Sequence, residues 1–245
     1  MSVLVPKQPP LQQFYRSGPL PCPYLPDRIE RKLFTRLAGP FSTEVNATLT
    51  QAGFRRSHDI LYRPVCPDCT ACVPVRVVVA EFRPDRTMRK LTRLNSDLYV
   101  IEVAAVATPE QLALFQYYQS IRHADSDMAR MESADFAAMI EDGQANTLVI
   151  ELRRHGSDEL VGAMLVDRVG QGHSAVYSFF NPLMTHRSLG TFLVLSLIDL
   201  CRQEGLLYLY LGYWIEGSRK MSYKARFQPL EALGAGGWRE LAPHT

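Results

Sequence analysis

Four cysteines are spaced as the ligands of a metal ion would be. Cys66, Cys69 and Cys72 form a C-x2-C-x2-C run, and Cys22 lies in a proline-rich segment closer to the amino terminus. Thiolates at this spacing can point at one ion, and their soft sulfur atoms suit zinc or an iron–sulfur cluster. No second C-x2-C pair completes a standard zinc finger. Free thiols that pack the amino-terminal segment against the rest of the chain are therefore the alternative.

A short polar segment between a predicted strand and a predicted long helix could bind an anion. It runs from His186 to Thr191 and contains Gly190. The first amides of a helix have no partner within the helix, so they can hold a phosphate or a carboxylate. Acetyltransferases that use coenzyme A place a small residue where this chain has Phe192, which argues against a coenzyme A site. An ordinary capped core helix is the alternative.

Basic residues gather in two parts of the amino-terminal half. The whole chain is nearly neutral, with 27 Lys+Arg against 25 Asp+Glu, so only such local clusters indicate a polyanion partner. Each cluster alone could be a solvated helix face, but the two together predict a surface that binds tRNA. The candidate residues of this surface are Arg28, Lys32, Arg36, Arg86, Arg89, Lys90 and Arg93.

A further group of cations follows an aromatic run near the carboxyl terminus. Arg219, Lys220, Lys224 and Arg226 lie close together, and Tyr223 is interleaved with them. Aromatic side chains in a strand usually belong to the core, but cations mixed with aromatic residues indicate a phosphate or carboxylate site.

The residues that position these groups fall into alternating helices and strands. Helices are predicted at residues 27–38, 42–52, 84–96, 108–122, 133–141 and 188–204. Strands are predicted at residues 54–65, 73–82, 99–105, 147–153, 159–169, 173–180 and 206–211. This order predicts an α/β or α+β fold with a mixed sheet. A boundary near residue 105 would divide residues 1–105 from residues 106–245, with the two halves packed tightly together.

Length and hydropathy exclude several classes of protein. With 245 residues, 47% of them hydrophobic, the chain can form a substantial core and is unlike a disordered chain. The opening residues lack the apolar stretch of a secretory signal. The most apolar segment, residues 189–201, contains Asp199 and is too short to span a bilayer. These features predict a soluble, cytoplasmic protein with no membrane partner and no DNA partner.

Six segments, taken together, resemble a known family. They are PCPYLPDRIERKLFTRL, LYRPVCPDCTACVPVRV, YSFFNP, RSLGTFLVLSLI, YLYLGYWI and GSRKMSYKARFQPLE, and they follow this order along nearly the whole chain. The chain is similar to the bacterial aspartate/glutamate leucyltransferases, which are relatives of the eukaryotic arginyl-tRNA–protein transferases. The resemblance implies transfer of leucine from Leu-tRNA to proteins with an N-terminal Asp or Glu, which then enter an N-degron degradation pathway.

The resemblance also has implications for the fold and for cofactors. It implies that residues 106–245 form a GNAT-like mixed-sheet half for aminoacyl transfer, packed against a smaller amino-terminal α/β half. The cysteine-containing half has been linked to metal or cluster binding in eukaryotic relatives. No cofactor is required for transfer, because the ester of an aminoacyl-tRNA is already activated.

The chemistry needs positioning and hydrogen-bond donors more than it needs a nucleophile. In a GNAT-like half, the strand at residues 175–180 would splay from its neighbour and hold both substrates. Tyr177 and Ser178 are the candidate hydroxyls near the leaving 3′ oxygen, and Asp125 or His123 is the candidate for proton transfer. The acceptor carboxylate requires cations, for which the candidates are Arg187, Arg219, Lys220, Lys224 and Arg226.

Three alternatives stay open from the sequence. An arginyl donor could replace the leucyl donor, since only the resemblance distinguishes the two. A coenzyme A-dependent N-acetyltransferase would share the predicted fold. A zinc-ribbon RNA-binding module without catalysis would use the cysteines, although their set is incomplete and the second half is large for such a module.

Overall fold

The computed structural model describes residues 11–143, 145–218 and 220–241 and contains one large sheet and two small ones. The order of the eight strands in the large sheet is β14-β13-β7-β12-β11-β10-β9-β8. Their bounds are β7 Val73–Val78, β8 Leu98–Ala104, β9 Thr147–Arg154, β10 Leu160–Val169, β11 Gly172–Phe180, β12 Tyr208–Trp214, β13 Leu230–Gly234 and β14 Gly237–Glu240. The parallel pair β11–β12 among antiparallel neighbours makes the sheet mixed, which confirms the predicted fold class.

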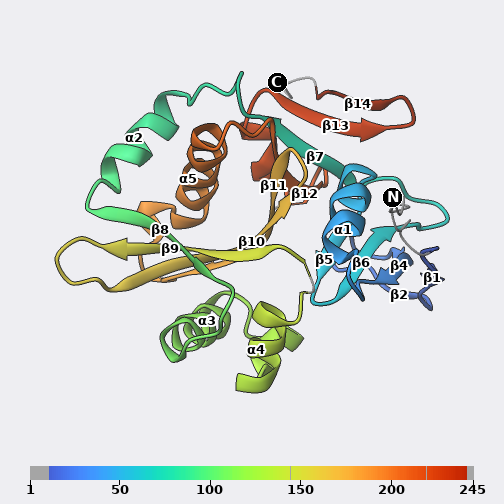
Figure 1. Ribbon diagram of the computed structural model, residues 1–245, viewed down its shortest axis with the longest axis horizontal. Coiled ribbons are helices and arrows are strands. Elements are labelled where there is room, and N and C mark those ends of the chain that lie inside the picture. Colours follow the sequence, from blue (N-terminus) through green and yellow to red (C-terminus); the bar gives the residue numbers. More distant parts are fainter. Residues whose placement is uncertain (1–10, 144, 219, 242–245) are drawn as a thin grey trace, which may run out of the picture.

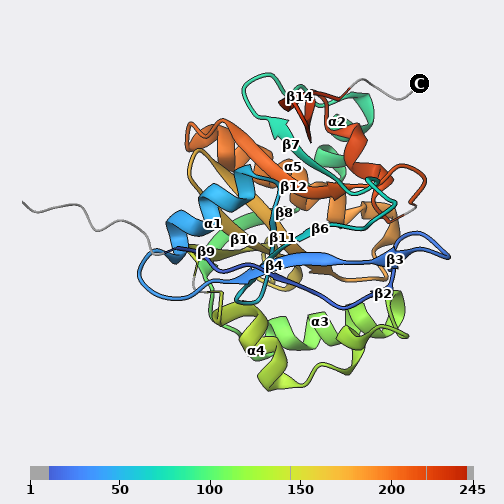
Figure 2. The same cartoon turned by 90° about the vertical axis from the view of Figure 1, so that its right-hand side faces the viewer.

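Helices cover both faces of the large sheet. On one face lies α5 (Leu189–Gln203), flanked by α2 (Arg86–Leu94), and on the other lie α3 (Pro109–Arg122) and α4 (Ser133–Glu141) (Figure 1). Figure 2 shows the same two layers of helices, with the sheet between them, after a quarter turn. The central helix α5 is apolar on most sides because it packs between the sheet and α2, and it contributes the largest share of one core cluster. A second core cluster, centred on Phe115 and Phe136, lies under α3 and α4. No helix in the part of the chain described here is both long and apolar enough to pass through a bilayer.

The small sheets are built from residues before β7. A four-stranded sheet has the order β1-β4-β6-β5, with bounds β1 Tyr15–Arg16, β4 Lys32–Arg36, β5 Arg55–Ser57 and β6 Ile60–Pro64. A two-stranded sheet pairs β2 (Leu20–Pro21) with β3 (Ile29–Glu30). Helix α1 (Ser42–Gln51) packs against both β5 and β10, where the small sheet meets the large one.

The prediction of a helix over residues 27–38 is wrong. This segment contains β3 and β4 instead, and β4 pairs with both β1 and β6. The misleading signal is the spacing of four between Lys32 and Arg36, which places side chains on one face of a helix and equally on one face of a strand. Pairing with strands distant in sequence decided between the two, and no local pattern records such pairing.

A buried ion pair joins the small sheet to the large one. Arg56 of β5 donates from Nε to Asp167 Oδ2 of β10 at 2.6 Å and from Nη2 to Oδ1 at 2.8 Å, and each side chain is only 1% exposed. Asn46 of α1 and Thr147 of β9 also donate to this carboxylate. Three elements that precede residue 105, namely β7, α2 and β8, belong to the large sheet and its cover. The division into residues 1–105 and 106–245 stays a prediction, and it would separate β8 from its partner β9.

The large sheet splits between β11 and β12. These strands pair only from Gly172 to Ser174, opposite Tyr208 to Tyr210. Beyond that point β12 bulges at Gly212, which has a φ of 74°, a conformation that glycine adopts without strain. The predicted splay at residues 175–180 is therefore confirmed, and it leaves strand carbonyls that need other donors.

Candidate active site

A cavity of about 750 Å³ opens where β11 and β12 diverge. Its walls come from α3, β11, the start of α5, β12 and the short 3-10 helix η3 (Ser222–Arg226). Among the described residues that line it, five are basic and none is a carboxylate. The basic residues are Arg55, Arg122, His123, Lys220 and Lys224. Such a cavity favours anionic ligands and disfavours cationic ones.

Tyr177 and Ser178, the two predicted hydroxyls, both line this cavity. The phenol oxygen of Tyr177 accepts a hydrogen bond of 3.0 Å from the side-chain amide of Gln119, which is 1% exposed. With its oxygen occupied in this way, Tyr177 keeps its own hydroxyl hydrogen for another partner. Burial raises the pKa of Tyr177, and the nearby Tyr118 adds to the rise. The phenol therefore stays protonated and can act as a donor.

Of the two candidates for proton transfer, the structure brings only His123 to the cavity. Its Nε2 lies 3.4 Å from the hydroxyl of Tyr118. Burial lowers the pKa of His123, and the charges of Lys220 and Arg122 lower it further. The imidazole is thus neutral near pH 7 and can accept a proton. Asp125 is exposed and is not among the residues that line the cavity.

The five cations predicted to bind the acceptor are placed in different surroundings. Lys220 is exposed and lines the cavity, while Arg226 is exposed but does not line it. Lys224 lines the cavity and is 5% exposed, and its Nζ donates to Tyr213 O at 2.6 Å. Burial holds the pKa of Lys224 well below its ordinary value, so this amine is a poor partner for a carboxylate. Arg219 lies outside the described residues.

Arg187 is engaged away from the cavity. Its guanidinium binds both carboxylate oxygens of Asp97 and donates to Leu94 O at 3.0 Å. Asn95, just after α2, donates in turn to Arg187 O at 3.0 Å. Arg187 therefore fastens the end of α2 to the start of α5 and is not free to receive an acceptor carboxylate. Phe192 is also turned away from the cavity, because it is 7% exposed and packs in the core.

Arg55, which the sequence did not single out, enters the split between the two strands. It donates from Nη1 to Leu211 O at 3.2 Å and from Nη2 to Ala175 O at 3.1 Å and to Val176 O. Gly212 leaves room for it, since a Cβ there would lie 1.6 Å from Arg55 Nη1. More than a hundred residues separate Arg55 from these partners, so no local motif could have indicated the contact.

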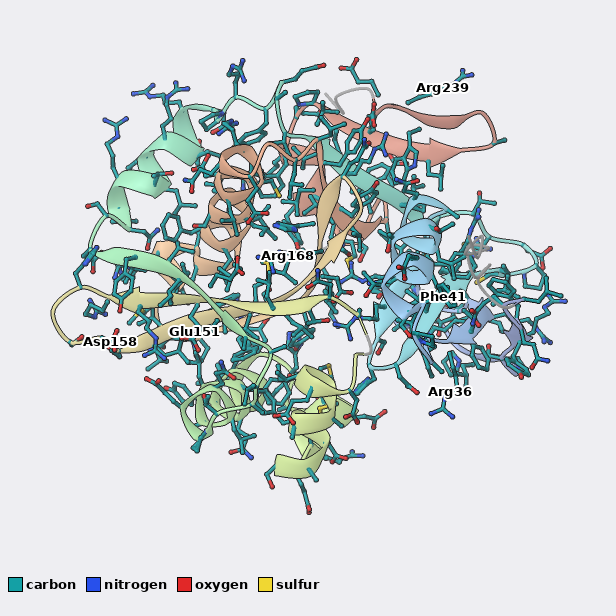
Figure 3. The ribbon with its side chains drawn as sticks, viewed as in Figure 1. Arg36, Phe41, Glu151, Asp158, Arg168 and Arg239 are labelled. Carbon is teal, nitrogen blue, oxygen red and sulfur yellow. The ribbon has the colours of Figure 1, made fainter. Side chains whose placement is uncertain are left out.

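The predicted tRNA-binding residues lie on two separate surfaces. On α2, the side chains of Arg86, Arg89, Lys90 and Arg93 are exposed, and none of them pairs with a carboxylate of the residues described. The other three are engaged with neighbours of the small sheets: Arg28 donates to Asp68 O at 3.5 Å, Lys32 lies 3.0 Å from Glu30, and Arg36 lies 2.6 Å from Asp59. Arg36 still reaches out from the edge of the molecule (Figure 3). The free charge is thus concentrated on α2.

The fold brings together the four cysteines predicted as candidate metal ligands. Cys22, Cys66, Cys69 and Cys72 line one cavity between the amino-terminal segment and β13–β14. Cys66 exchanges weak hydrogen bonds with the backbone of Arg31. Burial, followed by the other three cysteines, raises the pKa of Cys72 to about 12, which favours the protonated thiol. Within residues 11–143, 145–218 and 220–241, no three His, Cys, Asp or Glu side chains converge closely enough to hold a metal ion. The fold thus gathers the four thiols at the contact between the amino-terminal segment and β13–β14.

Comparisons with known proteins point to one family. Residues 20–90 match the family model described as arginine-tRNA-protein transferase, N terminus, and residues 110–234 match the one described as arginine-tRNA-protein transferase, C terminus. The aspartate/glutamate leucyltransferase of Gluconacetobacter diazotrophicus is 52% identical over 98% of this chain and 92% of its own length. That of Paramagnetospirillum magneticum is 50% identical over 94% of each chain. Among solved structures, L-PGS from Bacillus licheniformis is 10% identical, with a TM-score of 0.43 over 62% of this chain and 49% of that one.

Both family models follow the order of the chain, and together they include β7 and β9 to β13 of the large sheet and most of the small sheets. The relatives at about half identity extend over almost the full length. The chain therefore belongs to the arginine-tRNA-protein transferase family and is an aminoacyltransferase.

Proposed function

We propose that this enzyme transfers leucine from Leu-tRNA to proteins with an N-terminal Asp or Glu, acting in the cytoplasm and marking those proteins for an N-degron pathway. The observation that carries the proposal is the cavity at the strand split, which is lined by basic side chains and by no carboxylate of the described residues. The leucyl group and the acidic acceptor follow the name aspartate/glutamate leucyltransferase, which relatives about 50% identical carry, and tRNA follows the description of the family.

The reaction requires no covalent intermediate on the enzyme. The acceptor amine attacks the carbonyl carbon of the leucyl ester, and the bond from that carbon to the 3′ oxygen of the tRNA breaks. The amine loses a proton and the 3′ oxygen gains one. In this proposal Tyr177 donates a hydrogen bond to the oxygen on which charge develops, and the neutral His123 accepts the proton from the amine; both line the cavity, which supports these roles.

The basic lining acts on both ends of the acceptor residue. A side-chain carboxylate is attracted by the positive potential, and a neutral amide is not. The same potential favours loss of the proton from the α-ammonium group, whose ordinary pKa is about 7.7–8.0. The cavity thus selects an acidic residue and at the same time produces the neutral amine that can attack.

The exposed cations of α2 are the proposed docking surface for tRNA. None of them pairs with a carboxylate of the described residues, and Asn95 and Arg187 connect this helix to the start of α5, which lines the cavity. A tRNA lying along α2 can therefore bring its 3′ end to the split between the strands. Ser188, the N-cap of α5, and the first residues of this helix to Thr191 line the cavity where the terminal phosphate would pass.

Replacing both Arg89 and Arg93 with alanine should reduce the salt dependence of tRNA binding. Each lost phosphate contact lowers the slope of log K against log salt by about one, so the double variant should lose about one to two units. Binding would be measured by filter retention of Leu-tRNA between low and physiological salt. Arg130→Ala is the matched control, because Arg130 is exposed but lies after α3 and is 3.5 Å from Asp127. An unchanged slope in the double variant would remove α2 from the tRNA surface.

The two alternative enzymatic functions have less support. Transfer of arginine would need the same cavity, but the relatives near 50% identity are named as leucyltransferases. The argument from Phe192 against coenzyme A does not hold, because the ring of Phe192 packs in the core and does not face the cavity. The membership in a tRNA-dependent family argues against coenzyme A in its place.

One assay tests the proposed function directly. The enzyme would be incubated with labelled Leu-tRNA, labelled Arg-tRNA or labelled acetyl-coenzyme A, together with peptides that begin with Asp, Glu or Asn. We expect label only from Leu-tRNA and only on the Asp and Glu peptides. Transfer from Arg-tRNA or acetyl-coenzyme A at a comparable rate would contradict the proposal, as would equal labelling of the Asn peptide.

A further inference from the structure

The charged groups of the cavity differ in how well they could recognise a carboxylate. Lys224 and His123 have pKa values lowered by burial, so neither offers a reliable positive charge. Arg122 and Lys220 are exposed, and water and salt screen their attraction for an anion. Arg55 is the remaining cation of the described lining, and it is partly buried.

Arg55 has the geometry of a fixed anion receptor. Three strand carbonyls, those of Leu211, Ala175 and Val176, hold its guanidinium in the split. A guanidinium has five N–H donors and stays charged at any pH at which proteins fold. The three carbonyls use three of these donors, and no carboxylate of the described residues pairs with Arg55. The charge of the arginine is thus held in place but not neutralised.

We infer that Arg55 is the residue that recognises the side-chain carboxylate of the acceptor, and that the amino-terminal half contributes it to the active site. This inference rests on the proposed function and names the group that gives it specificity. A partly buried guanidinium without an anionic partner attracts a bound carboxylate more strongly than an exposed guanidinium does. The reason is that water and salt screen a partly buried ion pair less than an exposed pair. An N–H that the carbonyls leave free can donate to a carboxylate oxygen, while a neutral amide brings no negative charge to the guanidinium.

The contact also explains why the small sheet must be joined rigidly to the large one. Arg55 and Arg56 are neighbours on β5 and point to opposite sides of it, as consecutive strand residues do. Arg56 binds the buried Asp167 of β10, while Arg55 enters the split beside β11. The buried ion pair therefore sets the position of the guanidinium that faces the cavity, and Gly212 provides the space for it.

The test compares acceptors, since a purely structural role would affect them equally. Rates of leucyl transfer from Leu-tRNA would be measured for two peptides that differ only in an initial Asp or Asn, giving a ratio of kcat/KM values. In the Arg55→Gln variant this ratio should fall at least about 30-fold, mainly through a higher KM for the Asp peptide. Arg55→Lys should restore part of the ratio, because it keeps the charge without the planar fork.

A second variant keeps the inference testable if Arg55→Gln does not fold. Lys220→Gln removes an exposed cation from the same cavity and should leave the Asp/Asn ratio unchanged, whatever it does to the absolute rate. The inference is overturned if Lys220→Gln abolishes the ratio. It is also overturned if a folded Arg55→Gln variant loses activity equally on both peptides. If the unmodified enzyme does not distinguish Asp from Asn, the proposed function fails first, and this outcome is visible before any variant is made.

Discussion

Replacing Tyr177 with phenylalanine should lower kcat for leucyl transfer by about 100- to 1000-fold, which is the usual effect of removing one donor to a developing oxyanion. The hydroxyl lies at the cavity, and Gln119 donates to its oxygen at 3.0 Å. The phenol hydrogen is therefore left to interact with the substrate. Because this contact matters most in the transition state, KM for either substrate should change by less than about threefold. Single-turnover measurements with saturating Leu-tRNA would separate the chemical step from product release.

Tyr118 provides the matched control for this experiment. It lines the same cavity, and its hydroxyl lies 3.4 Å from His123 Nε2. Tyr118→Phe removes the same atom from a neighbouring wall, so it should reduce kcat far less than Tyr177→Phe does. Equal effects of the two changes, or a Tyr177→Phe variant with altered KM and normal kcat, would mean that Tyr177 only shapes the cavity.

Most elements of the large sheet and its helices could be predicted because local patterns determine them. Helix α4 begins and ends at the predicted residues, and α3 begins after the reciprocal hydrogen bonds of Thr108 and Gln111. Strands β9, β10 and β11 also lie within a residue or so of their predicted bounds. The alternation of apolar and polar residues, the glycine turns and the helix caps that predict these elements each extend over only a few residues. The strands at 29–36 were missed because their partners are distant in the chain.

Several predicted residues line the cavity, and Arg187, which does not, is engaged by a partner that is distant in the chain. Tyr177 and Ser178 line the cavity because they lie on β11 beyond the point where it separates from β12, and their catalytic roles stay a prediction. Arg187 was expected in the site because a basic residue before a helix suggests an anion. The carboxylate that pairs with Arg187 is that of Asp97, which lies in a loop 90 residues earlier in the chain. Arg55 was not predicted, because its partners are strand carbonyls more than a hundred residues further along the chain.

Lys224→Met should change how stability depends on pH. Burial lowers the pKa of Lys224 in the folded state, and in the unfolded chain that pKa returns to about 10.4. Between these two values the unfolded chain binds one proton more than the folded protein. The free energy of unfolding therefore falls as pH falls through this window, by about 1.4 kcal/mol per pH unit for one such group. The methionine variant lacks this term.

The stability of the two proteins should consequently diverge as the solution becomes less alkaline. Urea unfolding at pH 9, 8 and 7 would give the free energy of unfolding for each protein. We expect the difference between variant and unmodified protein to shift in favour of the variant by about 1.4 kcal/mol for each unit, until the pH reaches the lowered pKa. The loss of the hydrogen bond from Nζ to Tyr213 O offsets the curves by a constant and does not alter this slope.

Lys220→Met is the control, because Lys220 lines the same cavity but is exposed to water. It removes a cation from the same cavity without emptying a buried position, so a general effect of the lost charge would appear in both variants. The neighbours that act on Lys224 come from three other parts of the chain: Arg55 on β5, Cys72 before β7, and Tyr213 on β12, whose carbonyl accepts its hydrogen bond. Since none of them is a carboxylate, protonating Lys224 places a second positive charge beside Arg55.

If the curves for Lys224→Met and the unmodified protein run parallel from pH 9 to pH 7, Lys224 keeps its proton in the folded state. It would then join Arg55 as a second fixed cation of the cavity.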